Sequence, residues 1–280
     1  MENRYRLLIE TDDQKGLIHT VSGILLQHGL NIEQNSEFVE KESNRFFMRT
    51  EVSGVVSEGA ALVDELQSTL GQSAQIRLQR QRKKRVVILV TKEHHCIGDL
   101  LLRHRYNEME FEIAAVVGNY DHLADLVEGF GIAYHHVSHE GHTRESHEAA
   151  LVAAIAPYEP EYLVLAKYMR ILTPDFVARY ENRIINIHHS FLPAFIGANP
   201  YRQAYDRGVK IIGATAHFVT NDLDEGPIIA QSILPVDHTH SAVEMARAGK
   251  DVEKQVLSKA LRLVFDDRVF IHGNRTIIFE

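Results

Sequence analysis

The sequence holds a short run of polar side chains whose types and spacing could stabilise negative charge on an oxygen atom. Residues 186–190 read NIHHS and directly follow the apolar pair Ile184 and Ile185. Because Asn186 and His188 are two positions apart, their side chains point to the same side if a strand continues to His188. An amide NH2 and an imidazolium N–H are both donors, and two donors aimed at one oxygen stabilise a tetrahedral oxyanion. The alternative interpretation is that Asn186 satisfies a loop backbone and that His188 is an ordinary histidine.

A second polar cluster lies in residues 213–229, which read GATAHFVTNDLDEGPII. The segment passes from a strand-like stretch into an acidic loop that contains Asp222, Asp224 and Glu225. Crowding can raise the pKa of one of these carboxyl groups, whereas an imidazolium partner would lower it and stabilise its own charge. An ordinary solvated turn is the alternative, because Asp and Gly are frequent turn residues. Together, the two clusters favour one catalytic site over two unrelated turns.

From residue 86 onward, apolar runs of strand length alternate with helical stretches. The runs are VVILV (86–90), EIAAVVG (112–118), IAYHHV (132–137), YLVLA (162–166) and IINIH (184–188). Continuous apolar runs between helices are typical of a parallel sheet that is covered on both faces. We therefore predict a doubly wound, mostly parallel α/β domain of the Rossmann-like kind. Ligands of such sheets bind at the carboxyl ends of the strands, where Asn186 and His188 stand.

The first 80 residues follow a different order. Strand-like stretches at 4–11, 31–39, 46–52 and 74–79 alternate with helical patterns at 17–25 and 62–70. The order βαββαβ is the ferredoxin-like arrangement. We therefore predict a separate domain over residues 1–80. At the start of its first helix, Asp12 and Asp13 either cap the helix or, with Gly16, frame the amine of an effector.

A basic strip over residues 81–85 marks the boundary between the two predicted domains. It is either a solvated linker or an anion-binding patch. The second domain then covers residues 86–280. Near its end, Val252, Val256 and Ala260 recur at helical spacing and predict a long amphipathic helix, which we assign to packing.

Composition excludes several classes of protein. The 280 residues are 45% hydrophobic, which is ample for a packed core. No apolar run is long enough to span a membrane, and the N-terminus lacks a signal-peptide pattern, so we expect a cytoplasmic protein without membrane contact. The single cysteine, Cys96, excludes an internal disulfide. A net charge of -8 argues against nucleic acid as a partner.

Three segments closely resemble the folate-dependent formyltransferase fold: INIHHSFLPAF (185–195), HFVTNDLDEGPII (217–229) and LAKYMRIL (165–172). The N-terminal domain resembles an ACT domain, a class that commonly binds amino acids as regulators. The whole pattern is similar to the formyltetrahydrofolate deformylase family. Segments that extend the resemblance over essentially the whole chain are TDDQKGLI, NRFFMRTE, LVTKEHHCIGDLL, KYMRILTPDFVAR, AGKDVEKQVL and GNRTIIF.

The resemblance implies hydrolysis of 10-formyltetrahydrofolate to formate and tetrahydrofolate, which supplies formate for purine synthesis. Asn186 and His188 would polarise the formyl oxygen, and Asp224 would pair with His188 and orient or deprotonate the attacking water. No cofactor or metal is implied, and a homo-oligomer is expected. Residues that would hold the pterin, line its pocket or contact the substrate are Met169, Arg170, Ile171, Leu172, His189, His217, Val219, Thr220 and Asp222. Asp12, Gly16 and Asn31 would belong to the amino-acid site.

The attacking group distinguishes the deformylases from related transferases, and the alternative is a phosphoribosylglycinamide formyltransferase. Those transferases cradle the substrate phosphate on a Gly-rich loop after the first strand. Here that loop, residues 91–99, reads TKEHHCIGD and has one glycine and a glutamate, so it would bind phosphate poorly. His189 stands where those transferases typically have proline, and it could hold a water. We therefore expect hydrolysis.

Two further groups could suggest other chemistry. The histidines between His135 and His147 match no closed metal-binding motif, although a metal site there remains an alternative. Cys96 is either a thiol nucleophile or a small buried or loop residue.

Overall fold

The computed structural model describes residues 3–56, 59–194 and 200–280. The chain divides into two compact units. The small unit comprises Met1–Arg82, Asp267–Phe270 and Ile277–Glu280, and the large unit comprises Lys83–Asp266 and Ile271–Thr276. Phe195, the last residue of the segment 185–195 singled out above, lies outside the described residues.

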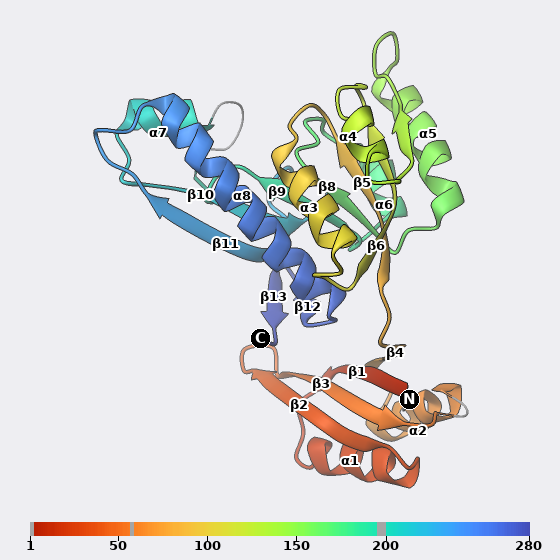
Figure 1. The fold of residues 1–280 in the computed structure, drawn as a ribbon. Coiled ribbons are helices and arrows are strands. Elements are labelled where there is room, and N and C mark those ends of the chain that lie inside the picture. The colour runs from red at the N-terminus through yellow and green to blue at the C-terminus, as the bar shows by residue number, and fades with distance from the viewer. Residues whose placement is uncertain (1–2, 57–58, 195–199) are drawn as a thin grey trace. The chain divides into compact units, whose positions relative to one another are not determined.

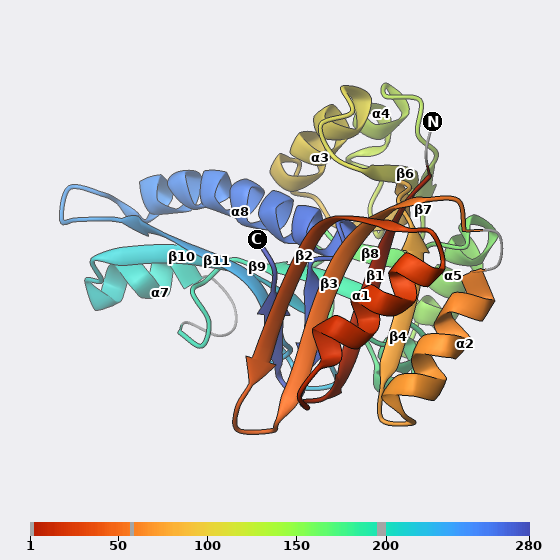
Figure 2. The same cartoon turned by 90° about the horizontal axis from the view of Figure 1, so that it is seen from below.

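The small unit has the predicted ferredoxin-like order. Its elements are β1 (Asn3–Asp12), α1 (Leu17–Gln27), β2 (Asn31–Glu40), β3 (Arg45–Gly54), α2 (Gly59–Leu70) and β4 (Gln75–Arg80). The strands form an antiparallel sheet in the order β2-β3-β1-β4. Helices α1 and α2 cover one face of this sheet (Figure 2), with Val21 and Leu66 in the shared core.

The other face of the small sheet is covered by residues from the end of the chain. Phe47 and Leu8 pack against Phe270 and Phe279, and the rings of Phe47 and Phe270 lie 5.5 Å apart at 70°. These C-terminal residues lie in the predicted second domain, 86–280, but group with the small unit. The apolar side chains on this face of the small sheet account for the grouping, because burial against Phe270 and Phe279 removes them from water.

The large unit contains a sheet of seven strands in the order β11-β10-β9-β8-β5-β6-β7 (Figure 1). Strands β9, β8, β5, β6 and β7 run parallel, whereas β10 is antiparallel to both of its neighbours, so the predicted mostly parallel sheet is confirmed. The strands are β5 (Lys84–Val90), β6 (Phe111–Gly118), β7 (Tyr134–His136), β8 (Tyr162–Leu165), β9 (Ile184–His188), β10 (Ile211–Phe218) and β11 (Ile228–Pro235).

Helices cover both faces of this sheet. On one face α5 (Arg144–Ile155) and α6 (Pro174–Arg179) pack on apolar side chains of β5, β6 and β8. On the other, α3 (His95–Arg105) and α8 (Ala242–Phe265) pack against each other and against the strands. The remaining elements are α4 (Ala124–Glu128), the 3-10 turn Ala156–Tyr158, α7 (Pro200–Arg207), β12 (Val269–His272) and β13 (Arg275–Ile278). No helix within the described ranges is long and apolar enough to cross a membrane.

The segment that links the two units is shorter than the predicted linker, residues 81–85. Lys84 and Arg85 lie in β5, and Lys84 is only 3% exposed. Its backbone N–H donates to the carbonyl of Glu110 at 3.1 Å, which starts the pairing with β6. Only residues 81–83 therefore connect β4 to β5.

The covered second face of the small sheet gives a stability prediction. Replacing Phe47 with Ala leaves a cavity among buried aromatic rings, so we expect the free energy of unfolding to fall by about 3–5 kcal/mol. Phe38→Ala is the matched control, because Phe38 pairs with Phe47 in the register but is 45% exposed, and we expect a loss within about 0.5 kcal/mol. Urea denaturation followed by circular dichroism measures both. Equal losses of unfolding free energy in the two variants would contradict the burial of Phe47 on the second face of the small sheet.

Candidate active site

A cavity of about 280 Å³ opens at the carboxyl ends of β8 and β9 in the large unit. This is where a doubly wound sheet is expected to bind ligands. The segment after β8, the end of β9 and the loop after β10 form its walls. The lining residues are Leu165, 167–172, 186–189, His217 and 219–224.

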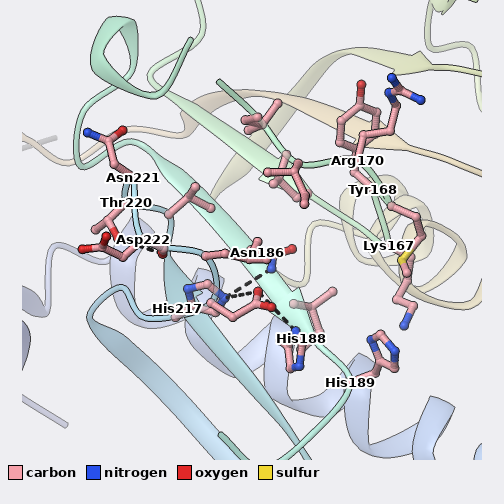
Figure 3. A pocket seen from close by; sticks show the side chains of 18 residues that line it. Lys167, Tyr168, Arg170, Asn186, His188, His189, His217, Thr220, Asn221 and Asp222 are labelled. Carbon is pink, nitrogen blue, oxygen red and sulfur yellow. Dashed lines mark hydrogen bonds and ion pairs between the residues drawn. The ribbon is translucent and has the colours of Figure 1, made fainter. Parts of the chain in front are cut away.

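The three predicted catalytic residues all line this cavity. Two of them, Asn186 and His188, are labelled in Figure 3 together with His217. His188 Nδ1 is 3.2 Å from Asp224 Oδ1, and His217 Nε2 is 3.7 Å from the same oxygen. Asn186 Nδ2 lies 3.2 Å from His217 Nε2. The register explains this arrangement, because β10 pairs with β9 so that His217 stands opposite Asn186. The strand at β9 continues to His188, as the two-residue spacing required.

His217 fixes the orientation of the Asn186 amide. Its Nδ1 lies 2.9 Å from the backbone carbonyl oxygen of Phe218, which can only accept, so Nδ1 carries a proton and donates. In the neutral imidazole, Nε2 then accepts one N–H of Asn186. The amide's second N–H remains for a ligand in the cavity.

His188 presents a buried ring nitrogen that has no hydrogen-bond partner among the described residues. Its Nδ1 faces Asp224, whereas Nε2 is the unpartnered atom. Leaving a buried polar group unpaired costs about 1–3 kcal/mol. A ligand oxygen that accepts from Nε2 would remove this cost.

Asp224 is held as an anion chiefly by His188. Burial alone would raise the pKa of this carboxyl group, but the hydrogen bond from His188 at 3.2 Å outweighs burial and holds the pKa well below its usual value. Asp224 has a left-handed backbone (φ 58°). Gly226, two residues later, lies so close to β10 that a Cβ would be 1.9 Å from the Phe218 carbonyl oxygen. The loop can therefore bring Asp224 to β9 only because position 226 lacks a side chain.

His189 is a neutral group beside this cluster. Its ring lies 5.2 Å from that of His188 and 6.1 Å from that of Tyr201. Burial, followed by the nearby charge of Lys167, lowers the pKa of His189 to about 4. Near neutral pH its imidazole can therefore accept a hydrogen bond as well as donate one.

All the predicted substrate-binding residues line the same cavity. They are Met169, Arg170, Ile171, Leu172, His189, His217, Val219, Thr220 and Asp222. The exposed apolar side chains of Met169, Ile171 and Leu223 stand at this cavity, where a flat aromatic ligand could cover them.

The three predicted regulatory residues do not meet within one chain. Asp12 pairs with Arg45 at one end of β3, and Asn31 pairs with Ser53 near the other end, so about 27 Å of strand separates them. Gly16 is the N-cap of α1, and no side chain caps this helix. The interpretation of Asp12 and Asp13 as helix caps is therefore wrong.

Asp12 instead forms a salt bridge. Arg45 Nη1 lies 2.8 Å from Asp12 Oδ1, and the same guanidinium reaches Glu10 at 3.2 Å. The effector interpretation of Asp12 and Gly16 stays a prediction.

Two charged residues near the cavity were missed by the sequence analysis. Lys167 lines the cavity directly after β8, and its ammonium lies 3.1 Å from Glu253 Oε2. Glu253 is only 1% exposed although it follows Val252 on the apolar face of α8. Glu253 could have been found from the sequence, because a charged residue among the apolar positions of an amphipathic helix indicates a buried charge. No comparable sequence feature marked Lys167.

The other candidate groups have structural roles. His135 Nε2 lies 2.6 Å from the Tyr158 hydroxyl, and His147 Nε2 lies 3.0 Å from the Val137 carbonyl oxygen. Within the described ranges, the acidic, histidine and cysteine side chains close enough to share a metal are those of His95, Cys96 and Glu253. Cys96 is buried, and burial raises the pKa of its thiol, which stays protonated and is no nucleophile.

Comparisons with known proteins show the family to which this chain belongs. Residues 84–261 match the formyl transferase family. The chain is 56% identical over 272 residues to formyltetrahydrofolate deformylase of Haemophilus influenzae, with 97% of this chain and 98% of that protein covered. It is 58% identical over 266 residues to the Escherichia coli protein of the same name, with 95% of each chain covered. The chain belongs to the formyltetrahydrofolate deformylase family.

Solved structures separate this family from its transferase relatives. A formyltetrahydrofolate deformylase from Pseudomonas syringae superposes with a TM-score of 0.95 at 39% identity and covers 100% of this chain and 95% of that one. A glycinamide ribonucleotide transformylase from Symbiobacterium toebii gives a TM-score of 0.68 at 30% identity and covers 71% of this chain and 95% of that one. The likeness to the deformylase therefore extends over the whole chain.

The low pKa of His189 predicts a pH dependence of stability. A histidine in the unfolded chain has a pKa of about 6.5, whereas His189 in the folded protein has a pKa of about 4. Between these values the unfolded state binds more protons, so this residue lowers stability as pH falls from about 6.5 to about 4. Replacing His189 with Asn removes this contribution. We expect the Tm of His189→Asn to fall less than that of the parent between about pH 7 and about pH 5.

The control for this measurement is His136→Asn, which changes an exposed histidine at the end of β7. Its Tm is expected to follow that of the parent over the same pH range. A His189→Asn protein whose Tm falls as steeply as that of the parent would contradict the low pKa.

Proposed function

We propose that this protein hydrolyses the formyl amide of 10-formyltetrahydrofolate to formate and tetrahydrofolate. The observation that carries the proposal is the convergence of Asn186, His188 and Asp224 in one cavity. Membership of the deformylase family supports the same substrate and the same reaction. Two donors, a carboxylate and an apolar rim are the groups that amide hydrolysis needs at one place.

Asn186 and His188 stabilise the charge that develops on the formyl oxygen. The second N–H of Asn186 and the unpartnered Nε2 of His188 both belong to groups that line the cavity. His188 acts as the imidazolium, with Nδ1–H donating to Asp224 and Nε2–H donating to the oxyanion. Each donor placed for the transition state contributes about 2.7–4 kcal/mol in comparable sites.

Asp224 is the group that orients and deprotonates the attacking water. Both of its histidine contacts go to Oδ1, so Oδ2 is the oxygen assigned to the water. The water oxygen bonds to the formyl carbon, the C–N10 bond breaks, and one water proton reaches N10 through the carboxylate. The other proton leaves with the product, which ionises to formate. His189 adds a neutral acceptor that can hold the water.

The substrate is positioned by the two segments that flank this cluster. Backbone groups of 169–172 and 219–222 hold the pterin, and Ile171 and Leu172 contribute apolar surface. Because the backbone makes these contacts, side-chain identity there can vary.

Formyl transfer to a ribonucleotide is disfavoured by the loop after β5. Glu93 in this loop carries a carboxylate that lies 2.6 Å from Lys250 Nζ. Lys250 is thus already paired with a carboxylate, and the loop lacks the glycines that would let backbone N–H groups surround a phosphate.

The wider role is part of the same proposal. Formate supports purine synthesis, and the reaction balances the one-carbon folate pool. We assign a cytoplasmic location, a homo-oligomeric state and no cofactor. An amino acid regulates the enzyme through the small unit, whose ferredoxin-like order suits an ACT domain.

Asp224→Asn tests the catalytic assignment. Asn keeps the shape of the carboxyl group, and its oxygen can still accept from His188, but its NH2 cannot accept the water proton, so we expect formate release to fall by about 10²–10⁴. The assay mixes purified protein with 10-formyltetrahydrofolate, without an amine acceptor, and measures formate and tetrahydrofolate together. The control is Asp206→Asn on α7, which pairs with Arg202 at the surface.

Two outcomes would count against the proposal. If the parent releases no formate, hydrolysis is not the reaction. If Asp224→Asn retains activity within about tenfold of the parent, another group deprotonates the water.

The effector assignment predicts a response that depends on Asp12. Each common amino acid is added to the formate assay, and the amino acid that changes the rate is then tested on Asp12→Ala. We expect the change in rate to disappear, because the variant lacks the carboxylate assigned to the effector's amine. Glu42→Ala, in the exposed turn between β2 and β3, should respond like the parent. An unaltered response in Asp12→Ala would place the effector elsewhere.

A further inference from the structure

A buried cluster of four polar side chains lies beneath one end of the substrate cavity. Glu253 on α8 accepts at its centre: His95 Nε2 lies 2.9 Å from Oε2, Lys167 Nζ 3.1 Å from the same oxygen, and the Tyr201 hydroxyl 2.6 Å from Oε1. Burial alone would raise the pKa of Glu253, but the hydrogen bond from His95 and the charge of Lys167 outweigh it and lower the pKa. The carboxylate is therefore ionised.

The cluster requires a close approach at Gly249, a left-handed backbone at Lys167 and the desolvation of a buried ion pair, all of which are unfavourable for folding. Gly249 lies one turn before Glu253, and a Cβ there would be 2.1 Å from the Tyr201 hydroxyl oxygen, so a glycine is needed for Tyr201 to reach Glu253. Lys167 has a left-handed backbone (φ 63°), which side chains other than glycine rarely adopt. A buried ion pair often fails to recover its desolvation cost, so stability does not explain this cluster.

The ammonium of Lys167 connects the cluster to the cavity. Lys167 and His189 both line the cavity, and Figure 3 shows the end of the Lys167 side chain next to the His189 ring. Glu253 accepts from this ammonium, which has two further N–H donors. The groups that act on His189 by charge are Lys167, Glu253, His188 and Asp224, and Tyr201 packs beside its ring. Burial and Lys167 keep His189 neutral.

We propose that Lys167, held in place by Glu253, makes water and not an amine the acceptor of the formyl group. This inference rests on the proposed hydrolysis. A water between Lys167 and His189 accepts from the ammonium and donates to the neutral imidazole. An aliphatic amine has a pKa of about 8–10, so near neutral pH it enters mainly as a cation, which the fixed ammonium repels. Repulsion of the wrong substrate is a direct source of specificity.

The two reactions differ only in the attacking atom. In hydrolysis, the water oxygen bonds to the formyl carbon, the C–N10 bond breaks, and N10 receives one water proton. In transfer, an amine nitrogen takes the place of the water oxygen, and N10 receives one amine proton. The ratio of formylated amine to formate therefore reports which acceptor the cavity admits.

The test adds excess glycinamide as the probe amine to enzyme and 10-formyltetrahydrofolate. Formate and N-formylglycinamide are measured by mass spectrometry. Lys167→Met removes the charge and keeps the length of the side chain, so we expect formate release to fall and the ratio of N-formylglycinamide to formate to rise by about tenfold or more. Lys254→Met is the matched control on α8, because Lys254 pairs with Asp251 and is absent from the cavity lining. It should keep the parent's ratio.

A second variant and a second measurement separate specificity from folding. Glu253→Gln keeps the shape of the anchor and retains Lys167, but weakens its attachment, so the ratio should shift in the same direction. Lys167→Arg retains the charge and should restore part of the parent's ratio. In NMR titrations, the pKa of His189 should rise in Lys167→Met, which a purely structural role of Lys167 would not produce.

The outcomes distinguish this inference from the function on which it rests. No formate from the parent would overturn the proposed hydrolysis. Formate from the parent, together with an unchanged product ratio in folded Lys167→Met and Glu253→Gln, would overturn only the role of Lys167. If Lys167→Met does not fold, the ratio in Glu253→Gln decides.

Discussion

The ion pair between His188 and Asp224 is the contact on which the candidate active site depends. It joins the end of β9 to the loop that follows β10, at a distance of 3.2 Å. The loop reaches this position because Gly226 lies directly against the backbone of Phe218. The pair holds Asp224 as an anion and leaves the other nitrogen of His188 without a partner among the described residues, so the proposed proton acceptor and the proposed oxyanion donor depend on one contact.

Unfavourable features gather at the ends of the strands of the large unit, whereas the strand interiors are apolar and buried. Asp224 and Lys167 both have left-handed backbones, and His188 keeps a buried nitrogen without a partner among the described residues. Such features persist only where the surrounding structure holds them. Here the support comes from β5, β8 and β9, whose side chains form a continuous core with α5 and α6. The rigid sheet thus supports a site that would not be stable by itself.

Much of the fold could be predicted because periodicity and turn residues are local properties. The order of the small unit and the mostly parallel sheet of the large unit agree with the prediction. The end of the chain could not be assigned, since nothing in GNRTIIF indicates that Phe279 packs with Phe47. The position of Lys84 could not be predicted either. From the sequence it belongs to a basic linker, whereas in the structure it lies in β5 and pairs with Phe111 of β6.

The sequence by itself determined which residues are proposed to carry the chemistry, because Asn186 and His188 share one side of the predicted strand and Asp224 stands in an acidic loop of the segment that resembles the family. The tertiary structure alone decided how they act together. The β9–β10 register places His217 where it orients Asn186, and the packing of α8 places Glu253 under Lys167. These contacts join segments far apart in the chain, and sequence spacing carries no information about such distances. Only the folded sheet and the helix packed on it bring the charges within reach of one another.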